Sequence, residues 1–99
     1  MMDSVSYARL IGEYIQTGGF SAENPVKAPE IAVKFKLHPS FVRGCVNTAR
    51  CMGIPICSNG AGYWYSLKEE EVRTTIEHIE DRIQKQQHAV SGLKASIGG

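Results

Sequence analysis

Apolar residues recur every three or four positions near the N-terminus, at Tyr7, Leu10, Ile11, Tyr14 and Ile15. This spacing predicts a helix over about residues 5–17 with one apolar face. Asp3 or Ser4 can cap its start, and the pair Gly18-Gly19 ends it. The segment that follows has the composition of a loop, and a short strand near Val26 fits its apolar character.

Two shorter helical patterns come next. Pro29 stands where a first helical turn tolerates proline, and the apolar residues after it predict a short helix within residues 28–37. His38 and Pro39 begin a further helix that runs until Gly53. The residues that fall on its inward face are Val42, Val46 and Ala49.

Residues 53–67, GIPICSNGAGYWYSL, have the pattern of two short strands joined by a glycine-rich tip. Because two strands alone are marginally stable in water, this hairpin must pack on something else. We expect Ile54, Ile56 and part of the cluster Tyr63-Trp64-Tyr65 to pack on the three helices, while the tip projects. A base-stacking platform is the alternative role for the aromatic cluster.

The C-terminal third carries a heptad pattern. Its core positions, spaced alternately by four and three, are Val72, Ile76, Ile79, Ile83, Gln86, Val90, Leu93 and Ile97. This predicts a coiled-coil helix of about 28 residues, roughly 40 Å long, that pairs with a second copy of the chain. The polar Gln86 can fix register or oligomeric state. Two alternatives stay open: the early turns pack on the first helix while the end frays, or a different protein binds this surface.

The predicted fold class is therefore mainly α with a small β-hairpin, followed by a long C-terminal helix. Two parts are expected: residues 1–67 as a helix-turn-helix domain with its hairpin, and residues 68–99 as the heptad helix, a dimerisation element.

Composition narrows the class of protein. Ninety-nine residues with 42% hydrophobic content make one modest domain. Since no apolar run approaches a membrane span and the N-terminus lacks a signal-peptide layout, we expect a cytoplasmic chain that binds no membrane. Cys45, Cys51 and Cys57 match neither a disulfide framework nor zinc-site spacing, which favours reduced, mostly buried thiols.

Charge is close to balanced, with a formal net charge of +1. Residues 1–67 hold six Lys or Arg against four acids, and residues 68–99 hold five against six. Neither imbalance identifies a partner by itself.

The third helix carries side chains suited to reading DNA. Its expected outward set is Ser40, Arg43, Gly44, Asn47 and Arg50. Arg can bind guanine bidentately, Asn can bind adenine, and Ser can reach a phosphate. Lys27, Lys36 and Asn59 are candidate phosphate contacts. The alternative is that these are ordinary solvated side chains. With so few cations, one copy should bind DNA weakly.

From Ala28 to Trp64 the chain resembles the winged helix-turn-helix domains of bacterial regulators such as the N-terminal domain of the biotin-operon repressor. The segments that carry the resemblance are PEIAVKFKL, HPSFVRGCVNTAR and GIPICSNGAGYW. Small phage-encoded winged-helix proteins with a helical tail are similar in layout. The family often has glycine where this chain has Lys36, and its recognition helix is more basic. The resemblance implies binding of double-stranded DNA through the third helix.

The leading hypothesis is thus a non-enzymatic DNA-binding protein, either a dimeric transcriptional regulator or a phage replication accessory factor. The alternative is a protein-interaction adaptor that keeps the fold without binding DNA. No nucleophile elbow, phosphate loop or metal cluster occurs in the sequence, so we expect no catalytic residues, no metal and no cofactor. His78 and His88 would lie roughly 15 Å apart along a helix, too far for one metal ion.

Overall fold

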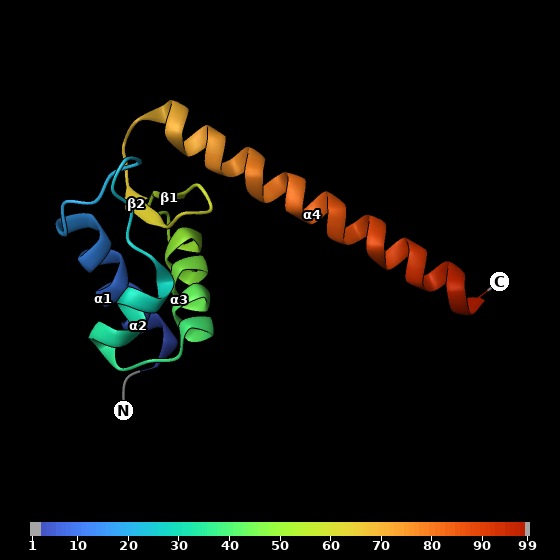
Figure 1. The fold of residues 1–99 in the computed structure, drawn as a ribbon, viewed down its shortest axis with the longest axis horizontal. Coiled ribbons are helices and arrows are strands. Elements are labelled where there is room, and N and C mark those ends of the chain that lie inside the picture. The colour runs from blue at the N-terminus through green and yellow to red at the C-terminus, as the bar shows by residue number, and fades with distance from the viewer. Residues whose placement is uncertain (1–2, 99) are drawn as a thin grey trace.

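The computed structural model describes residues 3–98, in which three helices and a hairpin form a compact body and a fourth helix projects from it (Figure 1). The elements in chain order are α1 (Ser4–Thr17), α2 (Ala28–Phe35), α3 (Pro39–Cys51), β1 (Ile56–Ser58), β2 (Tyr63–Tyr65) and α4 (Glu69–Gly98). The predicted fold class, mainly α with a small β-hairpin and a long C-terminal helix, is confirmed.

The helix starts follow the expected capping chemistry. The Asp3 carboxylate accepts a hydrogen bond of 2.9 Å from the backbone N–H of Ser6 at the start of α1. His38 caps α3, and Pro39 occupies its first turn, where a missing N–H costs nothing. The cap and proline residues predicted from the local sequence therefore lie at the starts of α1 and α3.

One hydrophobic core joins α1, α2, α3 and the inner face of the hairpin. Ile11, Ile31 and Val42 are fully buried in it, one from each helix. The other buried members are Ala8, Ile15, Val26, Ala28, Ala32, Cys45, Val46, Ala49 and Ile56. The predicted inward face of α3 is confirmed, since its three aliphatic residues all belong to this core.

The turn from α2 to α3 depends on a residue in an unfavourable backbone conformation. Lys36 has φ +57° and ψ +50°, the left-handed region that favours glycine. This conformation lets the N–H of Leu37 donate to the carbonyl of Ala32 at 2.9 Å, which closes the helix end. Lys36 therefore stands at a position where the backbone geometry favours glycine.

The hairpin is antiparallel and is extended by one residue from a distant loop. Ile56 pairs with Tyr65 and Ser58 with Tyr63. Val26 forms an isolated bridge to Tyr63, with N–H···O distances of 2.9 and 2.7 Å, as the sequence had suggested for this segment. Gly62 permits this approach, because a Cβ there would lie 2.6 Å from the Val26 oxygen.

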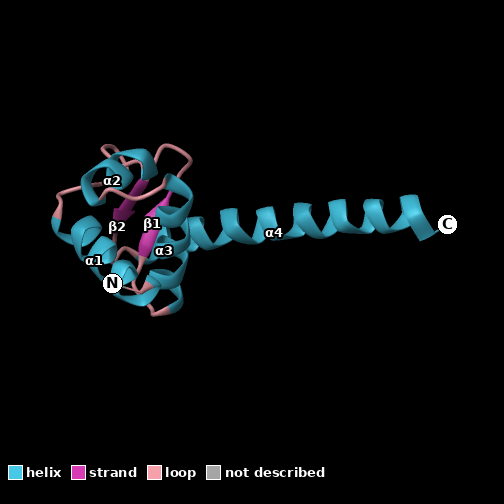
Figure 2. Ribbon diagram, turned by 90° about the horizontal axis from the view of Figure 1, so that it is seen from below, coloured by secondary structure: helices cyan, strands magenta, loops and turns pink. Residues whose placement is uncertain are grey.

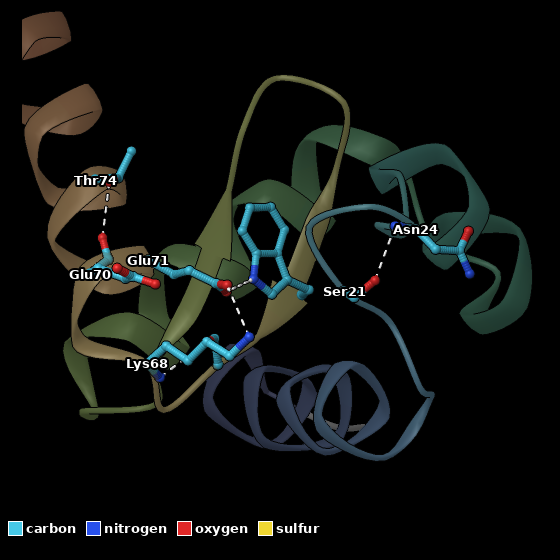
Figure 3. A network of polar contacts seen from close by, with 8 residues as sticks. Ser21, Asn24, Lys68, Glu70, Glu71 and Thr74 are labelled. Atoms are coloured by element: carbon cyan, nitrogen blue, oxygen red, sulfur yellow. Dashed lines mark hydrogen bonds and ion pairs between the residues drawn. The ribbon is translucent and has the colours of Figure 1, made fainter.

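The outer face of the hairpin is covered by the first turns of α4. Cys57 and Trp64 pair across the strands on this face, and Trp64 is only 5% exposed. The indole N–H of Trp64 donates to the Glu71 carboxylate at 2.7 Å, and the N–H of Ser58 donates to the Thr75 hydroxyl at 3.3 Å. Lys68 also pairs with Glu71 at 3.7 Å, as Figure 3 shows.

This docking changes two expectations from the sequence. The early turns of the C-terminal helix pack mainly on β1, whereas packing on the first helix was the alternative expected from the sequence. Trp64 is buried and hydrogen-bonded, so the aromatic cluster offers no open stacking platform, and Tyr63 and Tyr65 lie half-buried against the core. Burial of part of this cluster with Ile56 is confirmed.

Beyond these turns α4 is a free rod. From residue 80 to residue 98 every residue is exposed, and Figure 2 shows the helix running away from the body towards the C-terminus. The helix does not fray within the described residues. None of the helices within residues 3–98 is long and apolar enough to cross a membrane.

Replacing Lys36 by glycine should stabilise the fold. Lys36→Gly relieves the left-handed strain, which is worth about 1 kcal/mol, partly offset by the greater entropy of glycine in the unfolded chain. Urea unfolding measures the gain. Lys36→Ala is the matched control, because alanine removes the charge but keeps the strain; an equal gain from alanine would contradict the explanation.

Docking of α4 should weaken in acid through Glu71. Hydrogen bonds from Trp64 and then Ser66 lower the pKa of Glu71 below its ordinary value of 4.5. The ionised carboxylate therefore favours the folded state; its contribution is complete above 4.5 and is lost as the pH falls through the lowered pKa. Fluorescence of Trp64, the single tryptophan, reports this change.

Glu71→Gln keeps an acceptor for the indole but removes the charge, so its fluorescence should vary less with acid pH than that of the unchanged chain. Glu70→Gln is the control, since the indole N–H of Trp64 donates to Glu71 and not to Glu70. If the two variants behave alike, the Glu71 carboxylate does not govern docking.

Candidate nucleic-acid interface

Helix α3 presents one buried face and one free face. Val42, Cys45, Val46 and Ala49 anchor it in the core. The opposite side exposes Ser40, Arg43, Gly44 and Asn47. Nothing lies within 4 Å of the position that a Cβ on Gly44 would take, so this face is open to a large partner. The expectation that Arg43 and Asn47 remain uncovered is confirmed.

The start of α3 is fixed by its cap. The backbone N–H of Ser40 donates to Nδ1 of His38 at 3.1 Å, and the Ser40 hydroxyl lies 2.8 Å from the same nitrogen. The hydroxyl of Ser40 is therefore held near the helix N-terminus, where it is exposed. A helix N-terminus favours negative charge, so a phosphate would be accommodated there.

Arg50 is not on the open face, contrary to its expected outward position. Its Nε donates to the Ile56 carbonyl at 2.8 Å and its Nη2 to the Ser58 hydroxyl at 3.0 Å, both in β1. The guanidinium also lies 5.9 Å from the centre of the Tyr63 ring. The hairpin folds back over the last turn of α3, so this side chain joins the two elements.

Asn59 at the hairpin tip is exposed but also bonded within the fold. Its Oδ1 accepts a hydrogen bond from the N–H of Ala61 at 3.0 Å, which shapes the turn. Its Nδ2 donates to the Ala22 carbonyl at 3.4 Å. Its amide group therefore organises the loop, and a contact of Asn59 with phosphate stays a prediction.

The two candidate lysines lie at opposite ends of α2. Lys27 is the residue before its first turn, and Lys36 is in the turn that leads to α3. Both side chains are exposed. Lys27 is on the hairpin side of the body, because Val26 pairs with Tyr63.

A groove of about 460 Å³ runs between the start of α2, α3, the hairpin loop and α4. Its lining residues are Lys27, Ala28, Pro29, Arg43, Arg50, Ser58, Gly60, Ala61, Gly62, Tyr63 and Arg82. Four of these are cations and none is acidic. The structure thus brings Lys27, Arg43 and Arg50 together, and it leaves Ser40, Asn47, Lys36 and Asn59 outside the groove.

Burial and a neighbouring cation both act on the charge of Arg50 in this groove. Burial lowers the pKa of Arg50, Tyr63 and Cys57 act to raise it, and the charge of Arg82 acts to lower it further. The ion pairs found within residues 3–98 join Lys68 to Glu71, Arg73 to Glu69 and Lys85 to Asp81, and none of them includes Arg43, Arg50 or Arg82. An anion in the groove would relieve this repulsion.

Arg82 is the functional candidate that sequence reasoning missed. In the sequence, Arg82 lies between the heptad core positions Ile79 and Ile83, and nothing in the local pattern connects it to residues 27–63. Glu71 and Thr75 touch the hairpin, and Arg82 falls on the same side of α4, seven residues after Thr75. Helical periodicity identifies Arg82 as a groove residue only after the face of α4 that packs on the hairpin is known.

Other kinds of site are less well supported. No group of three or more His, Cys, Asp or Glu residues within residues 3–98 could hold a metal ion. Cys45 and Cys57 are buried, and burial raises the pKa of both thiols. Cys51 is exposed. Two of the three thiols are thus buried, as expected.

Comparison of the chain with family models, with curated proteins and with solved structures gives no match. The resemblance to winged helix-turn-helix domains therefore rests on the residues of this chain alone.

Replacing Arg50 should lower the free energy of unfolding, whereas replacing Arg43 should not. Arg50→Ala removes two hydrogen bonds and leaves their partially buried acceptors in β1 unpaired, a loss of about 1–3 kcal/mol in the free energy of unfolding. Arg43→Ala, at an exposed position on the same helix, should stay within about 0.5 kcal/mol of the unchanged chain. Thermal and urea unfolding compare the two; equal losses would mean that Arg50 does not hold the hairpin.

Proposed function

We propose that this chain binds double-stranded DNA, with α3 in the major groove and the hairpin beside it, in the manner that its resemblance to winged helix-turn-helix domains implies. The observation that carries the proposal is the groove in which Lys27, Arg43, Arg50 and Arg82 converge, next to the open face of α3. A polyanion is the partner class that best fits such a cluster.

The free face of α3 supplies the groups for base recognition. Arg43 and Asn47 are one helical turn apart and both exposed, so both can reach base edges from a helix lying in the major groove. Ser40, at the helix start, is suited to a phosphate. Arg43 thus lies at the border between the base-reading face and the cationic groove.

Phosphate contacts are assigned to the cations around this face. Lys27 and Arg82 line the groove from two different elements, and Lys36 lies in the turn before α3. These contacts position the helix without reading sequence. With so few of them, affinity for any duplex should be modest and sensitive to salt. The physiological role we propose is that of a transcriptional regulator or a phage replication accessory factor.

A titration of the full chain against random duplex DNA at two salt concentrations tests this function. Each phosphate contact contributes about 0.9 to the slope of log affinity against log salt. Arg82→Gln and Arg43→Gln should each reduce the slope by about that amount, because both remove a cation from the groove.

Two charge-matched variants control for net charge. Arg9→Gln removes an exposed arginine of α1, and Lys85→Gln removes an α4 lysine that pairs with Asp81 at 3.0 Å. Neither residue lines the groove, so neither variant should change the slope. Equal effects from all four variants would reduce the interaction to net charge and exclude the groove as the binding site.

A protein-interaction adaptor is the second candidate function. The hairpin loop favours it: residues 59–62 carry no charge, and the Asn59 amide bonds to the fold itself. An adaptor would show no salt-dependent affinity for duplex DNA in the same titration.

A further inference from the structure

The rod formed by α4 carries an uncovered apolar stripe. The helix is 30 residues long, about 45 Å, and the body covers only its first turns. Along the heptad core the exposed large apolar residues are Ile76, Ile83, Val90, Leu93 and Ile97, with Leu93 at 69% and Ile97 at 89% exposure. A stripe of this length on one helix face indicates an interaction surface.

This stripe lies beside the face that α4 uses internally and does not coincide with it. Thr75 is buried against the hairpin, and Arg82 faces the groove from the same side. Val72 and Ile79 are half-buried at the border between the two faces. A second helix can therefore lie along the stripe while the first turns remain docked on the hairpin.

We propose that the occupant of this stripe is α4 of a second copy of the chain, parallel and in register, so that Gln86 lies opposite the partner's Gln86. The proposal goes beyond DNA binding and does not depend on it. A heptad pattern is complementary to itself, because each core residue then meets its own copy in one layer. The four residues at the first core position, Ile76, Ile83, Val90 and Ile97, are all β-branched, and along the fully exposed part of the rod the second core position carries Gln86 and Leu93. β-Branched residues at the first position with leucine at the second favour two strands.

The surface of the stripe is also hollowed between its side chains. A shallow hollow on α4 has Ile83, Gln86 and Val90 among its lining residues. In a coiled coil, each core side chain of one helix inserts into a hole formed by four residues of the other. A single exposed helix presents half of that arrangement.

Gln86 decides the orientation. In an antiparallel pair, each residue of one core series faces a residue of the other series, so Gln86 would face Ile76, Ile83 or Val90, depending on the alignment. Each of these leaves a buried amide without a polar partner, which is costly. Only the parallel, in-register pair places two amides together, where they can hydrogen-bond to each other.

The flanking charges agree with this choice. In the parallel pair, Arg82 lies near the partner's Gln87 and Lys94 near the partner's Ala89, so neither of these cations meets a like charge. The antiparallel alignment that sets Gln86 against Ile83 brings Arg73 towards the partner's Lys94, and the one that sets it against Ile76 brings Arg82 towards its own copy. The remaining antiparallel alignment gains two exposed pairs between Glu80 and Lys94, but it also leaves two amides unpaired, and each exposed pair contributes less than an unpaired amide costs.

A parallel pair has a direct geometric consequence. Both bodies lie at the same end of the rod, and since each docks through the same flank of its helix, they lie on opposite sides of the coil. Two cationic grooves, each completed by its own Arg82, are then displayed together.

Two measurements test the proposal on the full chain. Its mass in solution by light scattering should be twice the 10.9 kDa of one chain. Val90→Cys keeps Gln86 in place and, made together with Cys51→Ser to remove the exposed native thiol, should form an intermolecular disulfide under mild oxidation, because opposing core positions meet disulfide geometry. His88→Cys in the same background points away from the stripe and should not form one. Circular dichroism and Trp64 fluorescence confirm that each variant is folded.

The antiparallel pair has its own signature. A mixture of Glu80→Cys and Lys94→Cys, each in the Cys51→Ser background, would form the mixed disulfide only if the chains run in opposite directions. A monomeric mass at the highest protein concentration used in the DNA titration, or that mixed disulfide without the one at position 90, would overturn the proposal. A doubled mass with the position 90 disulfide alone supports it.

Discussion

The hairpin can exist only because both of its faces are covered. Two strands of three residues each cannot sustain themselves in water. The inner face packs on the helical core through Ile56, and the outer face packs on α4 through the bond from Trp64 to Glu71 and the burial of Thr75. This second contact fixes the direction in which α4 leaves the body, so the position of every later residue of the rod depends on it.

The same contact completes the candidate interface. Once Thr75 is seated on the hairpin, helical periodicity carries Arg82 to the edge of the groove that Arg43 and Arg50 already line. The three arginines then differ in role by environment alone: Arg50 is tied to β1, Arg43 is free on α3, and Arg82 approaches from a separate element. The docked turns of α4 thus link the body, the groove and the exposed stripe.

Local patterns predicted most of the fold. The spacing of apolar residues located the helices and the buried face of α3, the proline and cap residues located their starts, and the free state of Arg43 and Asn47 followed from the face opposite to the core. Arg50 could not be placed this way, because helical spacing puts it with Arg43, and only the return of the hairpin decides that its guanidinium turns to the backbone of β1. The left-handed φ of Lys36 left one sign in the sequence, which is a lysine where the domains that this chain resembles often have glycine.

The sequence by itself determined the fold class, the inward and outward faces of α3 and the heptad stripe of α4, since each depends on periodicity within one element. Tertiary structure alone decided which surface the first turns of α4 occupy, and with it the inclusion of Arg82 in the groove. The physical reason is that a strand with alternating faces specifies two surfaces to be buried without specifying their partners. Those partners are chosen by contacts between residues far apart in the chain, such as Ser58 and Thr75.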